Sequence, residues 1–455
     1  MNPAIFREYD IRGVYGVDLT LQLAEAIGRA FGTRIRRRGG QRISVGYDIR
    51  PSSPALREAV VSGLLGVGID VVDIGACPTP TLYFSQFHLD VQGGVMITAS
   101  HNPSEFNGFK LCEEKTSLFG AQIQEVRAMI ERGEYDTGEG KVTEVVDFLS
   151  VYADDLAKRF GRLAARKVVV DCGNAAAALI APQILTRIGC EVIPLYCEPD
   201  GRFPNHHPDP TVPANLVDLI AEVKRHHADV GIAFDGDGDR LGVVDETGDI
   251  LWGDQLTLLF ATQILSTHPG ATIISEVKAS QVLYDEVERL GGRAIMWKAG
   301  HSLIKQKMRE TGALLAGEVS GHLFFSDRYF GYDDAIYAAC RLMEMRSQDD
   351  RPLSSYLSRL PKAHTTPEIR IDCPDNIKFD IVERCRAHFS TRHKTIDIDG
   401  VRILFDGGWG LIRASNTQPA LVLRCEAESS TRLQEIRQEV QTRVEEAIRA
   451  LPASG

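Results

Sequence analysis

Short apolar runs alternate along most of this chain with longer stretches in which apolar residues recur at helical spacing. This alternation is typical of α/β folds, in which helices cover the faces of a sheet. The pattern restarts after the polar stretch 133–147 and again near residue 254, which predicts three similar α/β units without a strict sequence repeat. Strands are predicted at 43–47, 70–74, 94–97, 168–170, 191–195, 230–234, 272–275 and 294–297, and helices at 21–38, 55–65, 149–160, 175–188, 254–266, 280–290 and 302–310.

The rhythm changes at about Pro361, where hairpin-like strands replace the alternation and a long helix at 431–450 follows them. Asp399-Gly400 is a hairpin-turn signal. The last strands are predicted at 368–371, 395–398, 401–405 and 421–425. At 455 residues the chain is too long for one core. We predict α/β domains with mixed sheets at 1–147, 148–250 and 251–361, and a smaller α+β domain at 362–455.

The composition excludes several classes of protein. A net charge of −11 argues against a general nucleic-acid binder. No apolar run reaches the roughly 18 residues of a membrane span, and the charged N-terminal residues do not resemble a signal peptide. The nine cysteines form no Cys-x-x-Cys pair, which fits reduced thiols rather than a disulfide framework or a zinc site. We therefore expect a cytoplasmic protein that acts on small molecules, with neither membrane nor nucleic acid as a partner.

The stretch Thr98-Ala99-Ser100-His101-Asn102-Pro103 follows the apolar run at 94–97. Pro103 prevents a helix from starting at once, so Ser100 and His101 are expected in a loop at the end of a strand. Neighbouring side chains on an extended chain point apart, so their adjacency does not predict a nucleophile–base pair. The Ser100 hydroxyl could instead carry a phosphoryl group, provided that a cation and in-line geometry are available.

Three aspartates at alternate positions supply the ligands for such a cation. Asp235, Asp237 and Asp239 follow a predicted strand and are separated by glycines, so their carboxylates can share one face and converge. Carboxylate oxygens are the preferred ligands of hard divalent cations. The spacing also resembles a calcium EF-hand loop, but Arg240 occupies the position where that loop needs glycine. We predict a metal site; the alternative is a solvated acidic turn.

Two further loops have side chains suited to a sugar phosphate. Gly317-Glu318-Val319-Ser320-Gly321-His322 combines a carboxylate, a hydroxyl and an imidazole that could bind neighbouring sugar hydroxyls. Arg413-Ala414-Ser415-Asn416-Thr417 combines a guanidinium with three small polar side chains, which suits a phosphate. Each of these loops could equally be an ordinary surface turn.

Together these motifs resemble the α-D-phosphohexomutase family, and most closely its bacterial bifunctional phosphomannomutase/phosphoglucomutase group. The resemblance covers nearly the whole chain, from Tyr9-Asp10-Ile11-Arg12-Gly13 to the 413–417 loop. It implies four domains around a central active-site cleft. The sugar loop is nearest to the Gly-Glu-Met-Ser-Gly-His of that group, with Val319 in place of Met. The stretches 205–210 and 331–334 match the group as well.

The resemblance also assigns roles to individual residues. Ser100 would be the phosphorylated serine and would share Mg²⁺ with Asp235, Asp237 and Asp239. The other residues near the reacting groups would be His101, Arg240 and two acid/base candidates, Arg12 and Lys110; a Lys110 whose pKa the cleft shifts is a hypothesis, because an ordinary lysine is a poor base. Substrate would be held by Tyr9, Lys278, His301, Glu318, Ser320, His322, Arg413, Ser415, Asn416 and Thr417.

The activity implied is reversible phosphoryl transfer between the 1- and 6-positions of mannose and glucose phosphates. A phosphoserine enzyme and a hexose 1,6-bisphosphate intermediate would carry it, with the bisphosphate also serving as activator. The expected partners are hexose phosphates alone, and the protein is expected to be a monomer. Two alternatives stay open: a phosphoglucosamine mutase, and a sugar-phosphate sensor without catalytic activity on the same fold.

Overall fold

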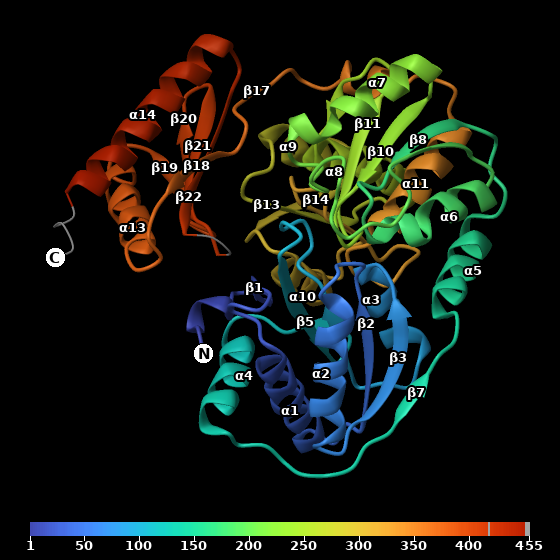
Figure 1. Ribbon diagram of the computed structural model, residues 1–455. Helices are drawn as coiled ribbons and strands as arrows, with labels where there is room; N and C mark the ends of the chain where they lie inside the picture. The colour runs from blue at the N-terminus through green and yellow to red at the C-terminus, as the bar shows by residue number, and fades with distance from the viewer. Residues whose placement is uncertain (417–418, 451–455) are drawn as a thin grey trace.

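The computed structural model describes residues 1–416 and 419–450, which form four sheets with helices packed against them (Figure 1). We refer to the parts built on these sheets, in chain order, as domains I to IV. The first three sheets are mixed and the fourth is antiparallel, so the predicted fold class is confirmed. None of the helices in the described part of the chain has both the length and the apolar character needed to cross a membrane.

Domain I has strand order β1-β5-β4-β2-β3-β7, with β6 paired to β5. Strands β2, β3, β4 and β7 are parallel neighbours, whereas β5 is antiparallel to β1, β4 and β6. The strands are β1 (Ile11–Val14), β2 (Arg42–Tyr47), β3 (Asp70–Ala76), β4 (Gly93–Ile97), β5 (Phe106–Glu113), β6 (Thr116–Ser117) and β7 (Val142–Glu144), and the helices are α1 (Leu21–Arg37), α2 (Ser53–Leu65), α3 (Thr79–His88) and α4 (Ala121–Arg132).

Domain II has strand order β12-β11-β10-β8-β9, with a parallel core of β10, β8 and β9. Its strands are β8 (Lys167–Asp171), β9 (Glu191–Leu195), β10 (Val230–Phe234), β11 (Leu241–Asp245) and β12 (Ile250–Leu251). Its helices are α5 (Phe148–Phe160), α6 (Ala181–Arg187) and α7 (Val217–His226), with 3-10 turns at Ala176–Leu179 and Pro213–Leu216. A 3-10 turn and α6 therefore replace the single helix predicted at 175–188.

Domain III has strand order β14-β13-β15-β16, in which only β16 is antiparallel. Its strands are β13 (Thr272–Glu276), β14 (Arg293–Trp297), β15 (Leu315–Gly317) and β16 (Leu323–Phe325). Its helices are α8 (Gly253–Thr267), α9 (Gln281–Arg289), α10 (His301–Thr311), α11 (Ala335–Gln348) and the short α12 (Ser354–Leu357).

Domain IV is an antiparallel sheet with helices α13 (Lys378–Phe389) and α14 (Ser430–Arg449). The strands are β17 (His364–Thr365), β18 (Ile369–Asp372), β19 (Lys394–Ile396), β20 (Val401–Phe405), β21 (Gly408–Ala414) and β22 (Ala420–Ala427). The hairpin predicted at Asp399-Gly400 is present, because β19 pairs with β20 across that turn. Strand β21 was not predicted.

Domain IV has a hydrophobic cluster of its own, and so has domain I, at residues 5–129. The cluster inside domain IV contains only residues from 369 onward. A single larger cluster instead runs through domains I, II and III, from Ile74 to Leu353. Figure 1 shows the C-terminal domain, drawn in red, beside the other three. A small cluster of Val277, Trp409 and Leu411 packs domain IV against domain III, so the hydrophobic contacts that join the first three domains are more extensive than those that hold the fourth.

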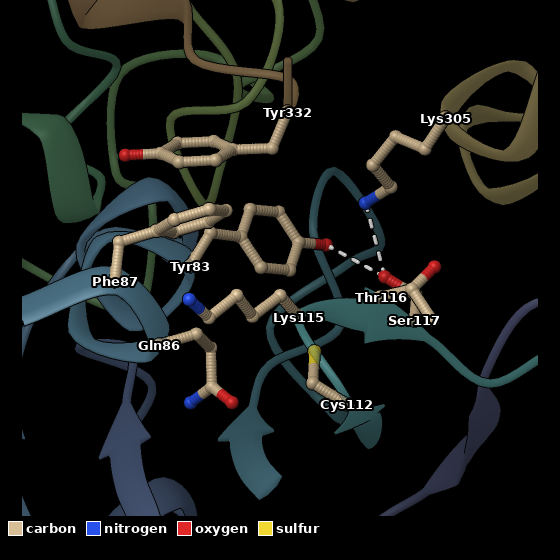
Figure 2. Close-up of a pocket in the computed structure, with 9 residues that line it drawn as sticks. All are labelled: Tyr83, Gln86, Phe87, Cys112, Lys115, Thr116, Ser117, Lys305 and Tyr332. Carbon is tan, nitrogen blue, oxygen red and sulfur yellow. Dashed lines mark hydrogen bonds between the residues drawn. The ribbon is translucent and has the colours of Figure 1, made fainter. Parts of the chain in front are cut away.

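A lysine from domain III fixes that domain to domain I. Lys305 on α10 donates hydrogen bonds to Ser117 Oγ at 3.0 Å and to Asp333 at 2.9 Å, and its ammonium lies 4.1 Å from the centre of the Tyr83 ring. Figure 2 shows Lys305 reaching across to β6. The cavity beside it has a volume of about 10 Å³, enough for about one water. These domains are therefore packed tightly against each other.

Candidate active site

The predicted motifs lie at the carboxyl ends of strands from all four sheets. Ser100 follows β4, Asp235 follows β10, Glu318 follows β15, and Arg413 is the penultimate residue of β21. Ligands in open α/β sheets bind outside the carboxyl ends of the strands. The motifs are brought together by contacts between domains, which the following paragraphs describe.

The Ser100 hydroxyl lies between an imidazole and a carboxylate. Its Oγ donates to Asp235 Oδ2 at 2.8 Å and lies 3.1 Å from His101 Nδ1. The prediction that adjacent Ser100 and His101 side chains point apart is wrong, because Ser100 has φ +50° and its backbone is left-handed rather than extended. Burial, together with the charges of Arg240 and Arg12, holds the pKa of His101 well below its ordinary value. His101 is therefore uncharged at neutral pH.

Arg50 holds the backbone of the Ser100 loop in place, and this residue was not predicted from the sequence. Its guanidinium donates to the carbonyl oxygens of Ser100 and Asn102 at 2.7 and 2.6 Å, and to those of Pro103 and Phe106 at 2.5 and 3.1 Å. Asp48 accepts the remaining Nε–H at 3.1 Å. Arg50 is fully buried. One feature of the sequence could have identified Arg50: it forms a charged pair with Asp48 directly after the apolar strand β2.

The aspartate loop approaches the serine loop closely because Gly236 has no side chain. A Cβ on Gly236 would lie 2.0 Å from the carbonyl oxygen of Ser100. No side chain fits at that distance, so the glycine lets the two backbones meet. Thr79, another residue that was not predicted, donates its hydroxyl to Asp237 Oδ2 at 2.6 Å.

The three carboxylates of Asp235, Asp237 and Asp239 converge as predicted, and all three side chains are fully buried. One oxygen from each lies within 4.8 Å of the others. Oδ1 of Asp237 and Oδ1 of Asp239 have no hydrogen-bond partner in the described part of the chain. Burial and the two neighbouring carboxylates hold the pKa of Asp235 well above its ordinary value. Buried acceptors without donors, in a group of three carboxylates, fit a hard divalent cation.

Lys110 places a cation beside two of these carboxylates. Its Nζ lies 2.8 Å from Asp237 Oδ2 and also pairs with Asp239. Burial alone would lower the pKa of Lys110, but the attraction of Asp237 and Asp239 outweighs it and raises that pKa well above its ordinary value. In this arrangement Lys110 is a positive charge, and its pKa is shifted in the direction opposite to that which a base needs.

Side chains next to the aspartate loop connect that loop to domain III. Arg240 donates from Nε to His322 Nε2 at 3.0 Å. The other ring nitrogen of His322 lies 3.2 Å from Asp333 Oδ2, which is 3.7 Å from His301 Nδ1. Asp333 was not predicted, although it lies in the 331–334 stretch that matched the family. Arg12 donates to Asn102 Oδ1 at 2.5 Å and pairs with Asp10, so it borders the serine loop.

The predicted sugar loop faces the N-terminal residues of the chain. Glu318 accepts from the backbone N–H of Gly300 at 2.7 Å, and Ser320 is half-buried in the same loop. Tyr9 donates its hydroxyl to the carbonyl oxygen of Ala299 at 2.7 Å, and its ring centre lies 5.7 Å from that of His301. Tyr9 of domain I thus lies beside the predicted sugar loop of domain III.

The predicted phosphate loop of domain IV joins the same region. Arg413 donates to Asp399 from Nε at 3.1 Å, and Lys378 donates to the carbonyl oxygen of Ser415. Asn416 donates to the Tyr9 hydroxyl at 3.0 Å. Asp399 was predicted only as part of a turn. Thr417 lies outside the described residues.

Lys278 and Glu368 connect domain III to domain IV beside that loop. Lys278 Nζ lies 3.1 Å from Glu368 Oε2 and 3.6 Å from Glu276 Oε1. The charge of Lys278 lowers the pKa of Glu368 to about 2, against the effect of burial. Contacts thus link several of the residues predicted to bind substrate: Tyr9 contacts His301 and Asn416, and Asp333 lies between His301 and His322.

Family models match the chain in four consecutive segments. These are the phosphoglucomutase/phosphomannomutase α/β/α domains I, II and III, at residues 3–137, 150–248 and 252–364, and the C-terminal domain of the same family, at residues 368–443.

Individual relatives match over nearly their whole length. A phosphomannomutase/phosphoglucomutase of Pseudomonas aeruginosa is 49% identical, over 95% of this chain and 94% of its own. A phosphoglucomutase of Neisseria gonorrhoeae is 43% identical, over 95% of each. The crystal structure of a phosphoglucomutase/phosphomannomutase family protein from Burkholderia thailandensis, 40% identical, superposes with a TM-score of 0.91 and covers 99% of this chain and 98% of that one. The chain belongs to the phosphoglucomutase/phosphomannomutase family.

Proposed function

We propose that this protein interconverts the 1- and 6-phosphates of glucose and of mannose through a phosphoserine at Ser100 and a hexose 1,6-bisphosphate. One observation carries the proposal: Ser100 Oγ lies 2.8 Å from Asp235, the first of three buried carboxylates. The other two, Asp237 and Asp239, each have an oxygen without a hydrogen-bond partner among the described residues. A transferable phosphoryl group needs a nucleophilic oxygen and a fixed counter-charge at the same place. The names of the Pseudomonas and Neisseria relatives support the choice of hexoses.

Asp235, Asp237 and Asp239 would hold Mg²⁺ together with an oxygen of the phosphoserine. When bound, the cation supplies charge that stabilises the oxygens of the phosphoryl group during transfer. Arg240 adds a positive charge on the same side. Lys110 already contacts two of the carboxylates and would remain beside them as a further cation.

In the first half-reaction a sugar hydroxyl attacks the phosphorus of phosphoserine. The new bond joins phosphorus to the sugar oxygen, the bond to Ser100 Oγ breaks, and the hydroxyl proton passes to a base. Of the two candidates, Arg12 borders the serine loop, and Lys110 would first have to lose its pairing with Asp237 and Asp239. The product is a 1,6-bisphosphate, which turns round. Its other phosphate then returns to Ser100 by the reverse step, and a free 1,6-bisphosphate would prime an unphosphorylated enzyme.

The substrate would be held at two places away from the reacting phosphoryl group. Glu318, Ser320 and His322 would bind the sugar hydroxyls. The phosphate that does not react would lie in domain IV, where the candidates are Arg413, Ser415, Asn416 and Thr417, with Tyr9, Lys278 and His301 along the edge. Because the sugar turns round, this pocket must accept a phosphate from either end of the hexose.

Access to Ser100 requires motion. The residue is 2% exposed, so a hexose phosphate reaches its Oγ only after neighbouring groups move. Domain IV has a separate core and carries the phosphate loop, so its displacement would open the site and its return would exclude water from the phosphoserine.

A substrate panel tests the proposal. Glucose 1-phosphate, mannose 1-phosphate and glucosamine 1-phosphate are each supplied with Mg²⁺ and a trace of glucose 1,6-bisphosphate. Comparable kcat/KM values on glucose and mannose phosphates, with glucosamine phosphate far behind, are expected. Preference for glucosamine phosphate would assign the protein to the phosphoglucosamine mutases, and no turnover by the primed, folded protein would favour the sensor.

The same proposal includes a monomer in the cytoplasm, where hexose phosphates are made and used. It also places the domain boundaries after residues 147, 250 and 361. Limited proteolysis near 361, yielding a C-terminal fragment that stays folded, would support the last of these boundaries.

A further inference from the structure

A cavity of about 310 Å³ lies where domain III meets domain IV, away from Ser100. The starts of α8 and α9 form one side, and β22 of domain IV contributes to another. The linker from Leu357 to Thr365, which joins the two domains, closes the remainder. No residue of the serine, aspartate, sugar or phosphate loops lines this cavity.

The cavity is lined by a buried arginine, Arg424, whose guanidinium makes few hydrogen bonds. Arg424 on β22 is 6% exposed, and the one hydrogen bond of its side chain within the described residues runs from Nη2 to Asp254 Oδ2 at 3.4 Å. Its Nε and Nη1 have no hydrogen-bond partner among residues 1–416 and 419–450. The same Asp254 oxygen also accepts from the backbone N–H of Ser280 at 3.0 Å, so Arg424 shares this acceptor with Ser280. A buried guanidinium with such weak pairing is costly unless an anion joins it.

The other carboxylate on β22, Glu426, does not line the cavity, although its Oε2 has no hydrogen-bond partner in the described part of the chain. Glu426 Oε1 accepts from Trp409 Nε1 and from the backbone N–H of Gln281, both at 2.9 Å. At the mouth of the cavity the exposed residue Lys362 adds positive charge from the linker. The local electrostatics therefore favour a negative ligand over a neutral or cationic one.

The apolar walls and the volume of the cavity indicate the size and polarity of the part of the ligand that carries the anion. Leu258, Leu283 and Leu360 contribute apolar surface beside the polar end. A volume of about 310 Å³ lies at the small end of the range for pockets that bind organic molecules, about 300 to 1,000 Å³. An oxyanion attached to a compact apolar body would place its charge at Arg424 and its body against the leucines.

We propose that this cavity binds a small organic anion, a carboxylate or phosphate carried on a compact apolar group, at the joint between domains III and IV. Such a ligand contacts both domains and the linker at once. Its affinity would differ between relative positions of domain IV, so it would shift the balance between them. The site is independent of the proposed chemistry at Ser100.

Fluorine NMR of two probes tests the proposal on the full-length protein. 4-Fluorobenzoate and 4-fluorophenyl phosphate carry the two oxyanions, and 4-fluorobenzamide is the neutral control. Saturable broadening by at least one anionic probe is expected, with binding about tenfold or more weaker for the amide, because a charge-assisted hydrogen bond is lost. Whichever anionic probe binds more tightly shows whether the cavity prefers a carboxylate or a phosphate. No saturable binding of either anion would overturn the proposal and leave a cavity that holds only water.

Two variants and one control assign the binding to this cavity. Arg424→Met should weaken the anionic probe about tenfold or more, since the counter-charge is gone. Ala363→Trp, on the exposed linker, should block the mouth without disturbing a core, so it keeps the test valid if the first variant fails to fold. Arg413→Ala, in the phosphate loop, should leave probe binding unchanged. Binding that survives the first two changes, or that is lost with Arg413→Ala, would overturn the proposal.

Discussion

The guanidinium of Arg50 donates a hydrogen bond of 2.7 Å to the carbonyl oxygen of Ser100, so the residue proposed to carry the phosphoryl group is held through its own backbone. The same guanidinium binds three more carbonyl oxygens of the loop. Ser100 has a left-handed backbone, which is unfavourable for residues other than glycine. The position of Oγ therefore depends on a side chain that does not face the substrate.

Arg50→Lys is expected to lower kcat roughly 100-fold with a smaller change in KM, because lysine cannot span four carbonyls and the loop shifts. Thermal stability should fall as well, since buried carbonyl oxygens lose their donors. Steady-state kinetics with glucose 1-phosphate measure the first effect and calorimetry the second. Arg202→Lys is the matched control, because the Arg202 side chain is 78% exposed. Unchanged kcat in Arg50→Lys would show that the loop holds its shape alone.

Ser100→Ala should abolish turnover, and Ser100→Thr should keep only a small fraction of it. Threonine retains a hydroxyl, but a β-branched side chain is strained at φ +50°. Incubation with glucose 1,6-bisphosphate followed by intact-mass spectrometry shows whether each variant takes up a phosphoryl group. Normal turnover by the alanine variant would refute a covalent mechanism.

Removal of divalent cations with a chelator should abolish activity, and Mg²⁺ should restore it. Added Mg²⁺ should also raise the melting temperature, because it binds a group of buried carboxylates that repel one another when empty. Asp237→Asn should weaken both effects, whereas Asp249→Asn, on the exposed side of the same region, should weaken neither. A melting temperature of the native protein that does not respond to Mg²⁺ would contradict a metal site here.

The Lys278–Glu368 pair should make the docking of domain IV sensitive to acid. Because Lys278 lowers the pKa of Glu368 to about 2, the carboxylate stabilises the folded state fully above pH 4.5 or so, and this contribution is lost as the pH falls toward 2. Calorimetry should therefore find Glu368→Gln less stable than the native protein by about 1 kcal/mol at pH 7, with the difference vanishing near pH 2. Glu58→Gln, on the exposed surface of α2, should match the native protein at both pH values. An equal loss at both pH values would mean that the ion pair contributes nothing.

The motifs predicted from the sequence meet in the structure because each is a short stretch after a strand, where the local pattern is informative. Ser100 and Asp235 are 135 residues apart and share a hydrogen bond. The backbone angle at Ser100 is set by contacts with distant residues, so the His101 contact could not be predicted from the order of residues. Arg50 and Thr79 were missed for the same reason, since each is a common residue type with a partner at least 50 residues away. Asp333 and Asp399 lie closer to His322 and Arg413, but their local sequence does not mark those contacts.

Two of the helices that were not predicted, α3 and α11, are buried along most of their length. In α3 the residues from Thr79 to Gln86 are all buried, and in α11 the same holds from Ala335 to Arg346. A helix that is covered on all sides does not alternate between apolar and polar faces, so the helical period disappears from its sequence. The amphipathic helices α1, α2 and α9 were predicted within two residues at each end.

The hydrogen bond between Tyr9 and Asn416 spans 407 residues of sequence. A ribosome that adds about 5 to 20 residues per second needs about 20 to 80 s to make the chain between them. Once residue 239 has been added, the nascent polypeptide contains the serine and the aspartates, but it still lacks domain IV. A newly made chain therefore gains its activity late, and a product of interrupted translation would have the reactive centre without the cover that protects a phosphoserine from water.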